Sequence, residues 1–215
     1  MTDIRMDWAR EKRTGLAEAV FCAGKTARQI DAILAEADGR RLLLTRLGPE
    51  KCDALDPLYR KALDYDPLSG TAFLGTPAPL TAGGAAVVCA GTSDLPVARE
   101  ATRTLAFYGW QAPLIADVGV TGLWRLMERL DEIRAHPVVI AVAGMEGALF
   151  SVLAGLVESV VIAVPSSIGY GVAANGQAAL SSALSSCAPG VLTVNIDNGF
   201  GAAGAAVKIL KLQSR

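Results

Sequence analysis

The segment Pro137-Val-Val-Ile-Ala-Val-Ala-Gly-Met-Glu-Gly-Ala-Leu149 is an apolar run that ends in a glycine-rich turn. Several consecutive apolar residues, without alternating polar residues, are typical of a strand that is covered on both faces. A helical pattern follows at about residues 147–157. A buried strand, a tight turn and a helix in this order form the unit from which parallel α/β sheets are built.

The same unit recurs along the last two thirds of the chain. Strand-like apolar runs occur at residues 85–90, 112–116, 137–142, 160–164 and 191–196. Helical patterns follow them at about residues 95–107, 120–134, 147–157, 176–186 and 199–210. We therefore predict the α/β class, with a parallel sheet between two helical layers. Ligands of such sheets bind beyond the carboxyl ends of the strands, here the loops at 91–95, 117–122, 143–148, 165–176 and 195–201.

The N-terminal third differs from the rest in its charge. Residues 1–68 hold 12 of the 20 Lys and Arg residues and 12 of the 21 Asp and Glu residues. Helical periodicity predicts helices at about 7–20 and 26–36, followed by a short strand at 41–45. The stretch 67–84 is rich in Pro and Gly, which is typical of a linker. The predicted organisation is a small charged α/β extension over 1–68, a linker over 69–84 and a catalytic domain over 85–215.

The composition argues against several classes of protein. A net charge of −1 gives no electrostatic basis for binding nucleic acid or an acidic membrane. The four cysteines form no C-x-x-C pair, and the first residues contain no apolar signal core. We therefore expect a cytoplasmic protein without disulfides. Residues 159–196 carry no charge, but their Pro and Gly residues leave no uninterrupted apolar window for a spanning helix.

The single histidine, His136, precedes a proline and a strand-like run, so we interpret it as a strand-edge residue. Machinery that pairs imidazole with a nucleophile or a metal is then not expected. Any chemistry must use carboxylate, thiol, hydroxyl or backbone groups.

The loop Ala90-Gly-Thr-Ser-Asp-Leu-Pro96 suits a helix start that binds an anion. Gly91 permits a tight turn, Thr92 or Ser93 can cap the helix, and the free N–H groups there favour a phosphate or a carboxylate. Asp94 would serve to hold ribose hydroxyls. The alternative is a capped helix that binds no ligand.

Two further loops carry candidate residues. Glu146 lies between glycines in an apolar sequence, which predicts a raised pKa and a role as general acid or base. The alternative is a carboxylate that is stabilised by a helix start. The loop Val164-Pro-Ser-Ser-Ile-Gly-Tyr-Gly171 offers hydroxyls and amides to a polar ligand, although such sequences are also common as simple turns.

Cys187 stands near the end of the charge-free stretch, just after a predicted helix. The partial negative charge of a helix C-terminus works against a thiolate there. Cys187 is therefore either a buried structural thiol or a nucleophile whose counter-charge comes from a cationic substrate. The segment Asn195-Ile-Asp-Asn-Gly-Phe-Gly201 that follows is polar and flexible, as a ligand loop should be.

Together these motifs resemble two related families. Ala-Gly-Thr-Ser-Asp-Leu-Pro (90–96), Ala-Gly-Met-Glu-Gly-Ala-Leu (143–149) and Val-Ile-Ala-Val-Pro (161–165) are similar to PurE-type aminoimidazole ribonucleotide (AIR) carboxylases and mutases. Ser-Cys-Ala-Pro-Gly-Val (186–191) and Val-Asn-Ile-Asp-Asn-Gly-Phe-Gly-Ala (194–202) resemble more closely the LarB family of pyridinium-3,5-biscarboxylic acid mononucleotide synthases. Arg10-x-x-Arg13-x-Gly15-x-x-Glu18 and Gly24-Lys25-Thr26 extend this resemblance to the N-terminal third.

The LarB resemblance implies a PurE-like αβα domain with an N-terminal extension, assembled as a homo-oligomer, an octamer. It implies carboxylation of C5 of the pyridinium ring of nicotinic acid adenine dinucleotide, with CO2 or bicarbonate as co-substrate and Mg2+ as cofactor. Hydrolysis of the phosphoanhydride then releases AMP, on the route to a nickel-pincer cofactor. The implied catalytic residues are Cys187, which adds to the ring, and Glu146, which assists.

Substrate contacts are expected from the loops already described, at Gly91, Thr92, Ser93, Asp94, Gly144, Met145, Ser167, Gly169, Tyr170, Asn195, Asp197 and Asn198. The chain also departs from the family pattern: Trp124 replaces a usual histidine, Phe150 a usual proline and Ala17 another proline. Two alternatives remain, an AIR carboxylase or mutase and a non-catalytic paralogue that binds nucleotide.

Overall fold

The computed structural model describes residues 4–213. The chain divides into two compact units, Met1–Ala78 and Pro79–Arg215. Each unit has its own sheet and its own buried core.

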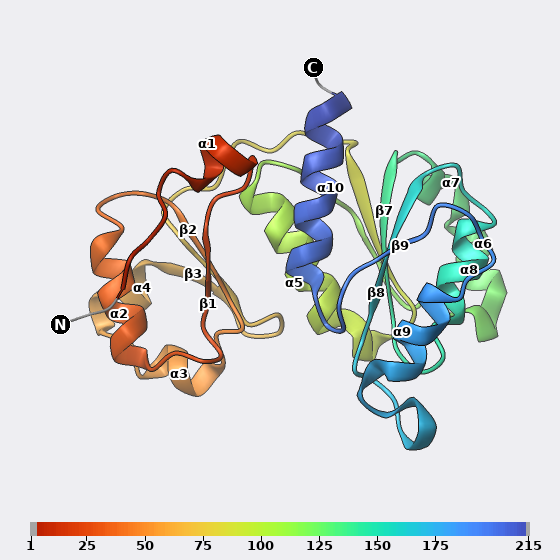
Figure 1. The fold of residues 1–215 in the computed structure, drawn as a ribbon, viewed down its shortest axis with the longest axis horizontal. Coiled ribbons are helices and arrows are strands. Elements are labelled where there is room, and N and C mark those ends of the chain that lie inside the picture. Colours follow the sequence, from red (N-terminus) through yellow and green to blue (C-terminus); the bar gives the residue numbers. More distant parts are fainter. Residues whose placement is uncertain (1–3, 214–215) are drawn as a thin grey trace. The chain divides into compact units, whose positions relative to one another are not determined.

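The first unit is built on a four-stranded sheet of order β1-β2-β4-β3 (Figure 1). β1 (Ala19–Phe21) and β2 (Leu42–Thr45) are parallel and are joined through α2 (Ala27–Glu36). β3 (Leu63–Asp66) and β4 (Thr71–Leu74) form an antiparallel hairpin, and β4 pairs with β2. α2 buries Ile30, Ile33 and Leu34 in the core of this unit. Three shorter helices complete it: α1 (Arg10–Thr14), α3 (Pro49–Asp53) and α4 (Pro57–Ala62).

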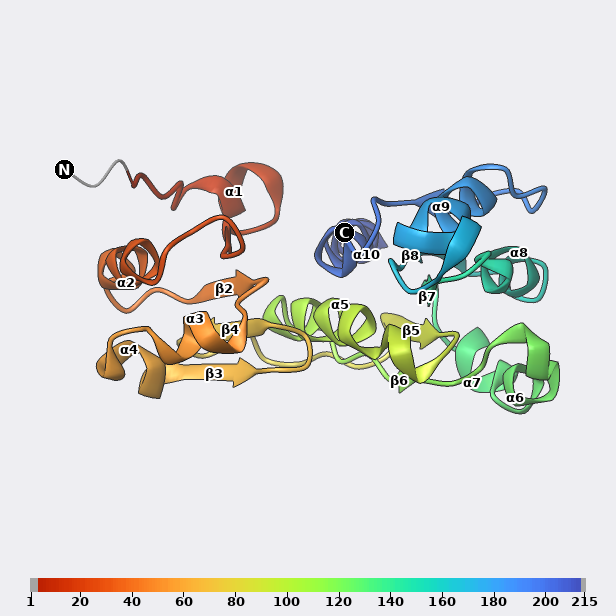
Figure 2. The same ribbon diagram turned by 90° about the horizontal axis from the view of Figure 1, so that it is seen from below.

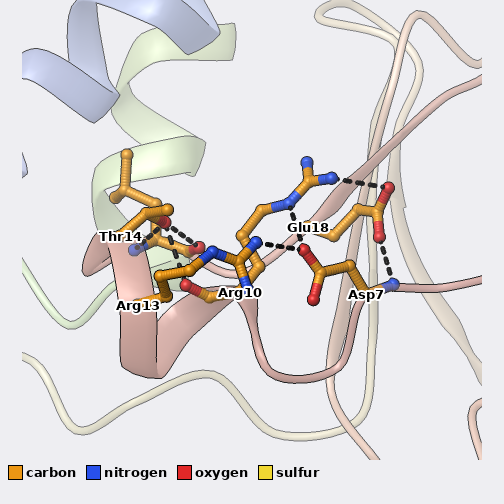
Figure 3. A network of polar contacts seen from close by, with 6 residues as sticks. Asp7, Arg10, Arg13, Thr14 and Glu18 are labelled. Atoms are coloured by element: carbon orange, nitrogen blue, oxygen red, sulfur yellow. Dashed lines mark hydrogen bonds and ion pairs between the residues drawn. The ribbon is translucent and has the colours of Figure 1, made fainter.

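The prediction of one helix over residues 7–20 is wrong, because the structure has only the short helix α1 there. α1 ends after five residues because Gly15 adopts a left-handed conformation, with φ +81°, at its C-cap. A polar network then ties the segment before α1 to the residues before β1 (Figure 3). Arg10 bridges Asp7 and Glu18, at 3.3 Å and 3.2 Å, and the Asp7 N–H donates to Glu18.

Part of the expected linker is also folded. Residues 71–74 form β4, and the side chains of Thr71, Ala72 and Phe73 are buried. The turn before β4 is fixed by Ser69, whose N–H and hydroxyl both donate to the Asp66 carboxylate. The Pro- and Gly-rich composition of this stretch therefore has two sources. One is the tight turn between β3 and β4, and the other is the connection between the two units.

The second unit contains the predicted parallel sheet. Its order is β6-β5-β7-β8-β9, and every neighbouring pair is parallel. The strands are β5 (Ala85–Cys89), β6 (Leu114–Ile115), β7 (Val138–Ala143), β8 (Val160–Pro165) and β9 (Leu192–Thr193). β5 and β7 are buried along their whole length, as their continuous apolar sequences require.

Helices cover both faces of this sheet, so the predicted three-layer αβα architecture is confirmed (Figure 2). α5 (Leu95–Phe107) and α10 (Gly199–Gln213) pack against each other on one face. The other face carries α6 (Leu123–Glu128), α7 (Leu130–Arg134), α8 (Ala148–Ala154) and α9 (Gln177–Leu184). Within residues 4–213, every helix is too short or too polar to cross a membrane.

Candidate functional site

A cavity of about 300 Å3 lies at the carboxyl edge of the second sheet. It is formed by the segments that follow β5, β6, β7 and β8: Ala90, Gly91, Ser93, Asp94, Gly119, Val120, Thr121, Ala143, Gly144, Met145, Glu146, Ala148, Leu149 and Ile168. The chain runs from β5 to β6 on one side of it, and the connection after β6 crosses back to β7 on the other side, so the direction of strand addition reverses at β5. Such a switch point is where open α/β sheets bind their ligands.

The cavity brings together six of the fourteen substrate-binding and catalytic residues that the sequence indicated. Gly91, Ser93, Asp94, Gly144, Met145 and Glu146 all line it. The remaining candidates do not line it: Thr92, Ser167, Gly169, Tyr170, Cys187, Asn195, Asp197 and Asn198. Val120, Thr121 and Ile168 also line the cavity. The sequence indicated their loops, 117–122 and 165–176, as ligand loops but did not indicate these three residues.

Asp94 is the most constrained polar residue of the cavity, with 4% of its surface exposed. Its carboxylate accepts hydrogen bonds from the Gly91 N–H at 2.9 Å, the Ser166 hydroxyl at 2.5 Å and the Gly144 N–H. Burial raises the pKa of Asp94, and these hydrogen bonds offset only part of that rise. Asp94 thus ties the loops after β5, β7 and β8 to one another.

Ser166 was not among the sequence candidates. It is fully buried at the end of β8, and its hydroxyl donates to Asp94. A serine in a Pro-Ser-Ser-Ile loop looks like an ordinary turn residue, so the sequence carried no signal for this contact.

The loop after β7 requires glycine at position 144. A Cβ on Gly144 would lie 2.2 Å from the carbonyl oxygen of Ile168. Met145 follows with φ +52°, and its N–H donates to that same oxygen at 2.7 Å. The two loops are therefore in direct backbone contact, which leaves no room for a side chain between them.

Glu146 lies on the rim of the cavity with an exposed side chain. The apolar enclosure expected for it is not formed by the described chain, so that expectation is wrong. Met145 and Gly147 on either side of it both have positive φ. Glu146 is accessible to a ligand that covers the cavity mouth.

Within the described chain Cys187 is exposed, so the burial that the structural-thiol alternative requires is not formed there. α9 ends at Leu184 and β9 begins at Leu192, which places Cys187 in the connection that leads to the amino end of β9. The cavity lies beyond the opposite, carboxyl ends of the strands, and Cys187 does not line it. The preceding Ser186 hydroxyl lies 2.7 Å from that of Ser151 on α8.

The other cysteines are buried and have weaker claims as nucleophiles. Burial raises the pKa of Cys22 and of Cys89 to about 11, and it also raises the pKa of Cys52. A thiol with such a pKa is almost entirely protonated at neutral pH. Cys187 is the exposed cysteine of the chain.

The candidates beyond β8 and β9 form a separate group at the edge of the sheet. The Asp197 carboxylate accepts from the Ser167 N–H at 2.7 Å, and the Asp197 N–H donates to the Pro165 carbonyl at 2.8 Å. Asn198 accepts from the Gly201 N–H at 2.8 Å and so caps α10. Tyr170 is 77% exposed. Asp197 thus joins the loop after β8 to the loop after β9.

The residues that depart from the family pattern lie outside the cavity as well. Phe150 is fully buried in the core between α8 and the sheet. Trp124 is 64% exposed on α6. His136 lies two residues before β7, and its Nδ1 lies 3.0 Å from the Glu132 carbonyl oxygen, so its interpretation as a strand-edge residue is confirmed.

The cavity offers carboxylates but no cation. Its charged lining residues are Asp94 and Glu146, and none of the lining residues is Lys, Arg or His. Within residues 4–213, no three His, Cys, Asp or Glu side chains gather as a metal site. Mg2+ commonly uses one or two carboxylates together with substrate phosphates, so a metal held mainly by the substrate fits this donor set.

Comparison with known proteins gives relatives that match part of the chain. An uncharacterized protein, MJ0165, of Methanocaldococcus jannaschii is 47% identical over 129 residues, which are 58% of this chain and 49% of that protein. The chain thus spans about half the length of this curated relative. Crystal structures of Treponema denticola PurE2-S38D and PurE are 20% and 17% identical, with TM-scores of 0.45 and 0.44. They cover 60% of this chain and 89% and 90% of their own.

Family comparison assigns both parts of the sequence. Residues 1–76 match the LarB/PurE-like N-terminal domain, and residues 85–215 match the AIR carboxylase family. The second match covers more than half of the chain, and the order of the two is the order expected from the motifs. The chain belongs to the LarB family and carries a PurE-like AIR carboxylase domain.

Proposed function

We propose that this protein carboxylates C5 of the pyridinium ring in nicotinic acid adenine dinucleotide and then hydrolyses the phosphoanhydride. The products are AMP and pyridinium-3,5-biscarboxylic acid mononucleotide, a precursor of a nickel-pincer cofactor. The observation that carries this proposal is the cavity at the sheet's switch point, where Asp94, Gly144 and Glu146 of two family motifs converge. Carboxylase chemistry is common to both families that share this domain.

The chemistry requires a nucleophile because a pyridinium carbon does not attack CO2. Addition of the Cys187 thiolate to the ring carbon beside C5 forms a C–S bond and cancels the positive charge of the ring. The resulting enamine has an electron-rich C5, which forms a C–C bond to CO2. A base then removes the C5 proton, and the electron pair expels the thiolate and restores aromaticity. The net change replaces hydrogen by carboxylate and releases one proton.

Glu146 is suited to the role of that base. It lies at the cavity rim, where it is free to approach a bound ring, and its loop is fixed by backbone contact with Ile168. Closure of the mouth by substrate would desolvate this carboxylate and raise its basicity. Asp94 has an anchoring role, since its raised pKa and its position suit a hydrogen bond with ribose hydroxyls.

The two phosphates of the dinucleotide need a counter-charge that the cavity residues do not supply. Mg2+ held mainly by the substrate phosphates would supply that counter-charge, and Glu146 is the exposed carboxylate among the lining residues that could help to hold it. In the hydrolysis, water forms a bond to one phosphorus of the phosphoanhydride, the P–O bond to the bridging oxygen breaks, and AMP and the mononucleotide leave with one phosphate each. CO2, supplied as such or as bicarbonate, is the co-substrate.

A complete site requires a second copy of the chain. Cys187 lies toward the amino end of β9, whereas the cavity lies beyond the carboxyl ends. Apolar side chains of the same charge-free stretch are exposed: Ile168, Tyr170, Val172, Leu184 and Leu192. Burial of such a surface against another copy is favourable. The proposed assembly is therefore a homo-oligomer, an octamer by family resemblance, in which one protomer's thiol meets its partner's cavity.

Turnover of the dinucleotide tests the proposal. The protein is incubated with nicotinic acid adenine dinucleotide, bicarbonate and Mg2+, and the products are separated and weighed by mass spectrometry. We expect AMP and a mononucleotide that has gained the mass of one CO2. Cys187→Ala should lower the rate by about a thousandfold or more, as loss of a covalent nucleophile does. Ser185→Ala, at an exposed neighbour, is the control and should keep the native rate.

The second candidate is an AIR carboxylase or mutase, because the matched domain carries that family's description. Within residues 4–213 the one histidine stands at the amino edge of the sheet, away from the cavity. The same assay with carboxyaminoimidazole ribonucleotide decides between the two. Turnover of that compound, with none of the dinucleotide, would replace the first proposal by the second.

A further inference from the structure

A second cavity, of about 660 Å3, lies within the N-terminal unit. Its walls come from residues 4–6, from Glu18, from the loop between β1 and α2, and from the first two turns of α2. This volume lies in the range of small-molecule sites, which is about 300–1,000 Å3. Nothing in the proposed carboxylation uses these residues.

The charges around this cavity are predominantly positive. Arg5, Lys25 and Arg28 line it, and within residues 4–213 none of the three forms an ion pair. Glu18 is the carboxylate among its lining residues, but its oxygens are already engaged by the Asp7 N–H and by Arg10 (Figure 3). Three cationic side chains around one hollow attract an anion.

Hydrogen bonds within the N-terminal unit fix the loop and the helix start that line this cavity. The Lys51 ammonium donates to the carbonyl oxygens of Cys22 and Ala23, at 2.7 Å and 2.9 Å, and so fixes the loop that carries Lys25. Thr26 and Gln29 form a reciprocal capping box at the start of α2. A loop that is ordered without ligand loses little entropy when it binds one.

Part of the lining is apolar. Ile4 and Met6 from the N-terminal segment and Ile33 from α2 contribute hydrocarbon surface beside the three cations. Inorganic phosphate would leave that surface uncovered, whereas a phosphate ester with a flat organic body would cover it. The size, the charge and the mixed lining together specify a ligand of nucleotide size.

We infer that the N-terminal unit contains a binding site for a nucleoside monophosphate, with Arg5, Lys25 and Arg28 around the phosphate group and the apolar wall against the organic body. This site is separate from the carboxylation cavity in sequence and in composition. The inference does not depend on the proposed reaction, because it concerns equilibrium binding alone.

Calorimetry on the full-length protein tests the inference, with AMP, adenosine and inorganic phosphate as probes and no dinucleotide present. AMP should bind, adenosine should bind about tenfold more weakly or worse because it lacks the charged group, and added salt should weaken AMP binding. Lys25→Gln combined with Arg28→Gln should weaken AMP binding by about tenfold or more. Lys12→Gln with Lys61→Gln makes the same charge change at exposed positions outside the cavity, and should leave it unchanged.

Asp94→Asn changes only the carboxylation cavity, which can itself bind AMP as a product, so the site in the N-terminal unit should still bind AMP in this variant. Thermal unfolding of each variant checks that the fold is retained. We expect it to be retained, because all four basic positions lie at the surface or are half-buried. The inference is overturned if the native protein does not bind AMP or binds adenosine equally well. It is also overturned if Lys25→Gln with Arg28→Gln leaves the affinity unchanged, or if Asp94→Asn alone abolishes it.

Discussion

At the scale of single residues, the cavity in the PurE-like domain is organised by a buried carboxylate. Asp94 accepts hydrogen bonds from three loops but remains almost inaccessible to water. A charged group in such a place stabilises the arrangement of its donors and at the same time costs solvation free energy. The site thus retains a group that is not optimal for stability, which is common where a residue serves a ligand.

This cost predicts a pH-dependent effect of Asp94→Asn. Because burial raises the native pKa of Asp94 above its usual 3.8, its stabilising contribution is present below that value and is lost as pH rises through the native pKa. Asparagine imitates the neutral form at every pH. The variant's gain in free energy of unfolding should therefore be small in acid and larger at neutral pH.

Denaturant unfolding at a series of pH values measures this difference. Asp131→Asn is the control, because the Asp131 side chain is fully exposed and should give no such trend. A stability difference for Asp94→Asn that stays constant from acid to neutral pH would contradict the assignment of burial as the cause.

At the scale of elements, the connection between β7 and α8 depends on a glycine that contacts the neighbouring loop. Gly144→Ala places a methyl group against the Ile168 carbonyl, which should lower the free energy of unfolding by about 1–3 kcal/mol. Carboxylation should fall more steeply than stability, because the displaced loop carries Glu146. Gly155→Ala, at a position with an ordinary φ and space for a methyl group, should change stability by about 0.5 kcal/mol or less. Equal stabilities of the two variants would refute this account.

The elements also explain what could be predicted from the sequence. The strands of the second sheet are continuous apolar runs such as 137–142. Such runs indicate strands that are buried on both faces, and this predicted both their existence and their parallel direction. In the N-terminal unit, β1 and β4 have three and four residues, too few for periodicity to identify. The same loops after β5 and β7 that were chosen from the sequence line the cavity. The contact of Ser166 with Asp94, by contrast, depends on positions that are 72 residues apart.

At the scale of the whole molecule, the charge-free stretch from 159 to 196 has two different parts. Its beginning, β8, is buried in the sheet, whereas several apolar side chains further along are exposed, with Val172 at 100%. A stretch of this length without charge favours burial, and within one chain only its first part is buried. The proposed partner copy accounts for the remainder, and it also brings Cys187 to a cavity.

A shared site predicts that two inactive variants complement each other. Glu146→Gln and Cys187→Ala should each be inactive alone, with rates lowered by about a hundredfold or more. When the two are unfolded together and reassembled, or produced in one cell, some sites receive a native glutamate from one chain and a native thiol from the other. With random mixing, about a quarter of the native activity should return.

The mixed sample is compared with an equal mixture of the separately assembled variants, which should remain inactive. Failure of the mixed assembly to regain activity, although sedimentation shows that it has formed, would mean that the two residues act within one chain or not in the same site.

The central claim, covalent catalysis by Cys187, is tested most directly by mass spectrometry of the protein itself. The protein is mixed with nicotinic acid adenine dinucleotide without bicarbonate, quenched and digested, and the peptide that contains position 187 is weighed. The account predicts an adduct of the dinucleotide on Cys187 that disappears in Cys187→Ala and on addition of bicarbonate as turnover proceeds. Carboxylated product formed at the native rate by Cys187→Ala, or an adduct confined to another residue, would contradict it.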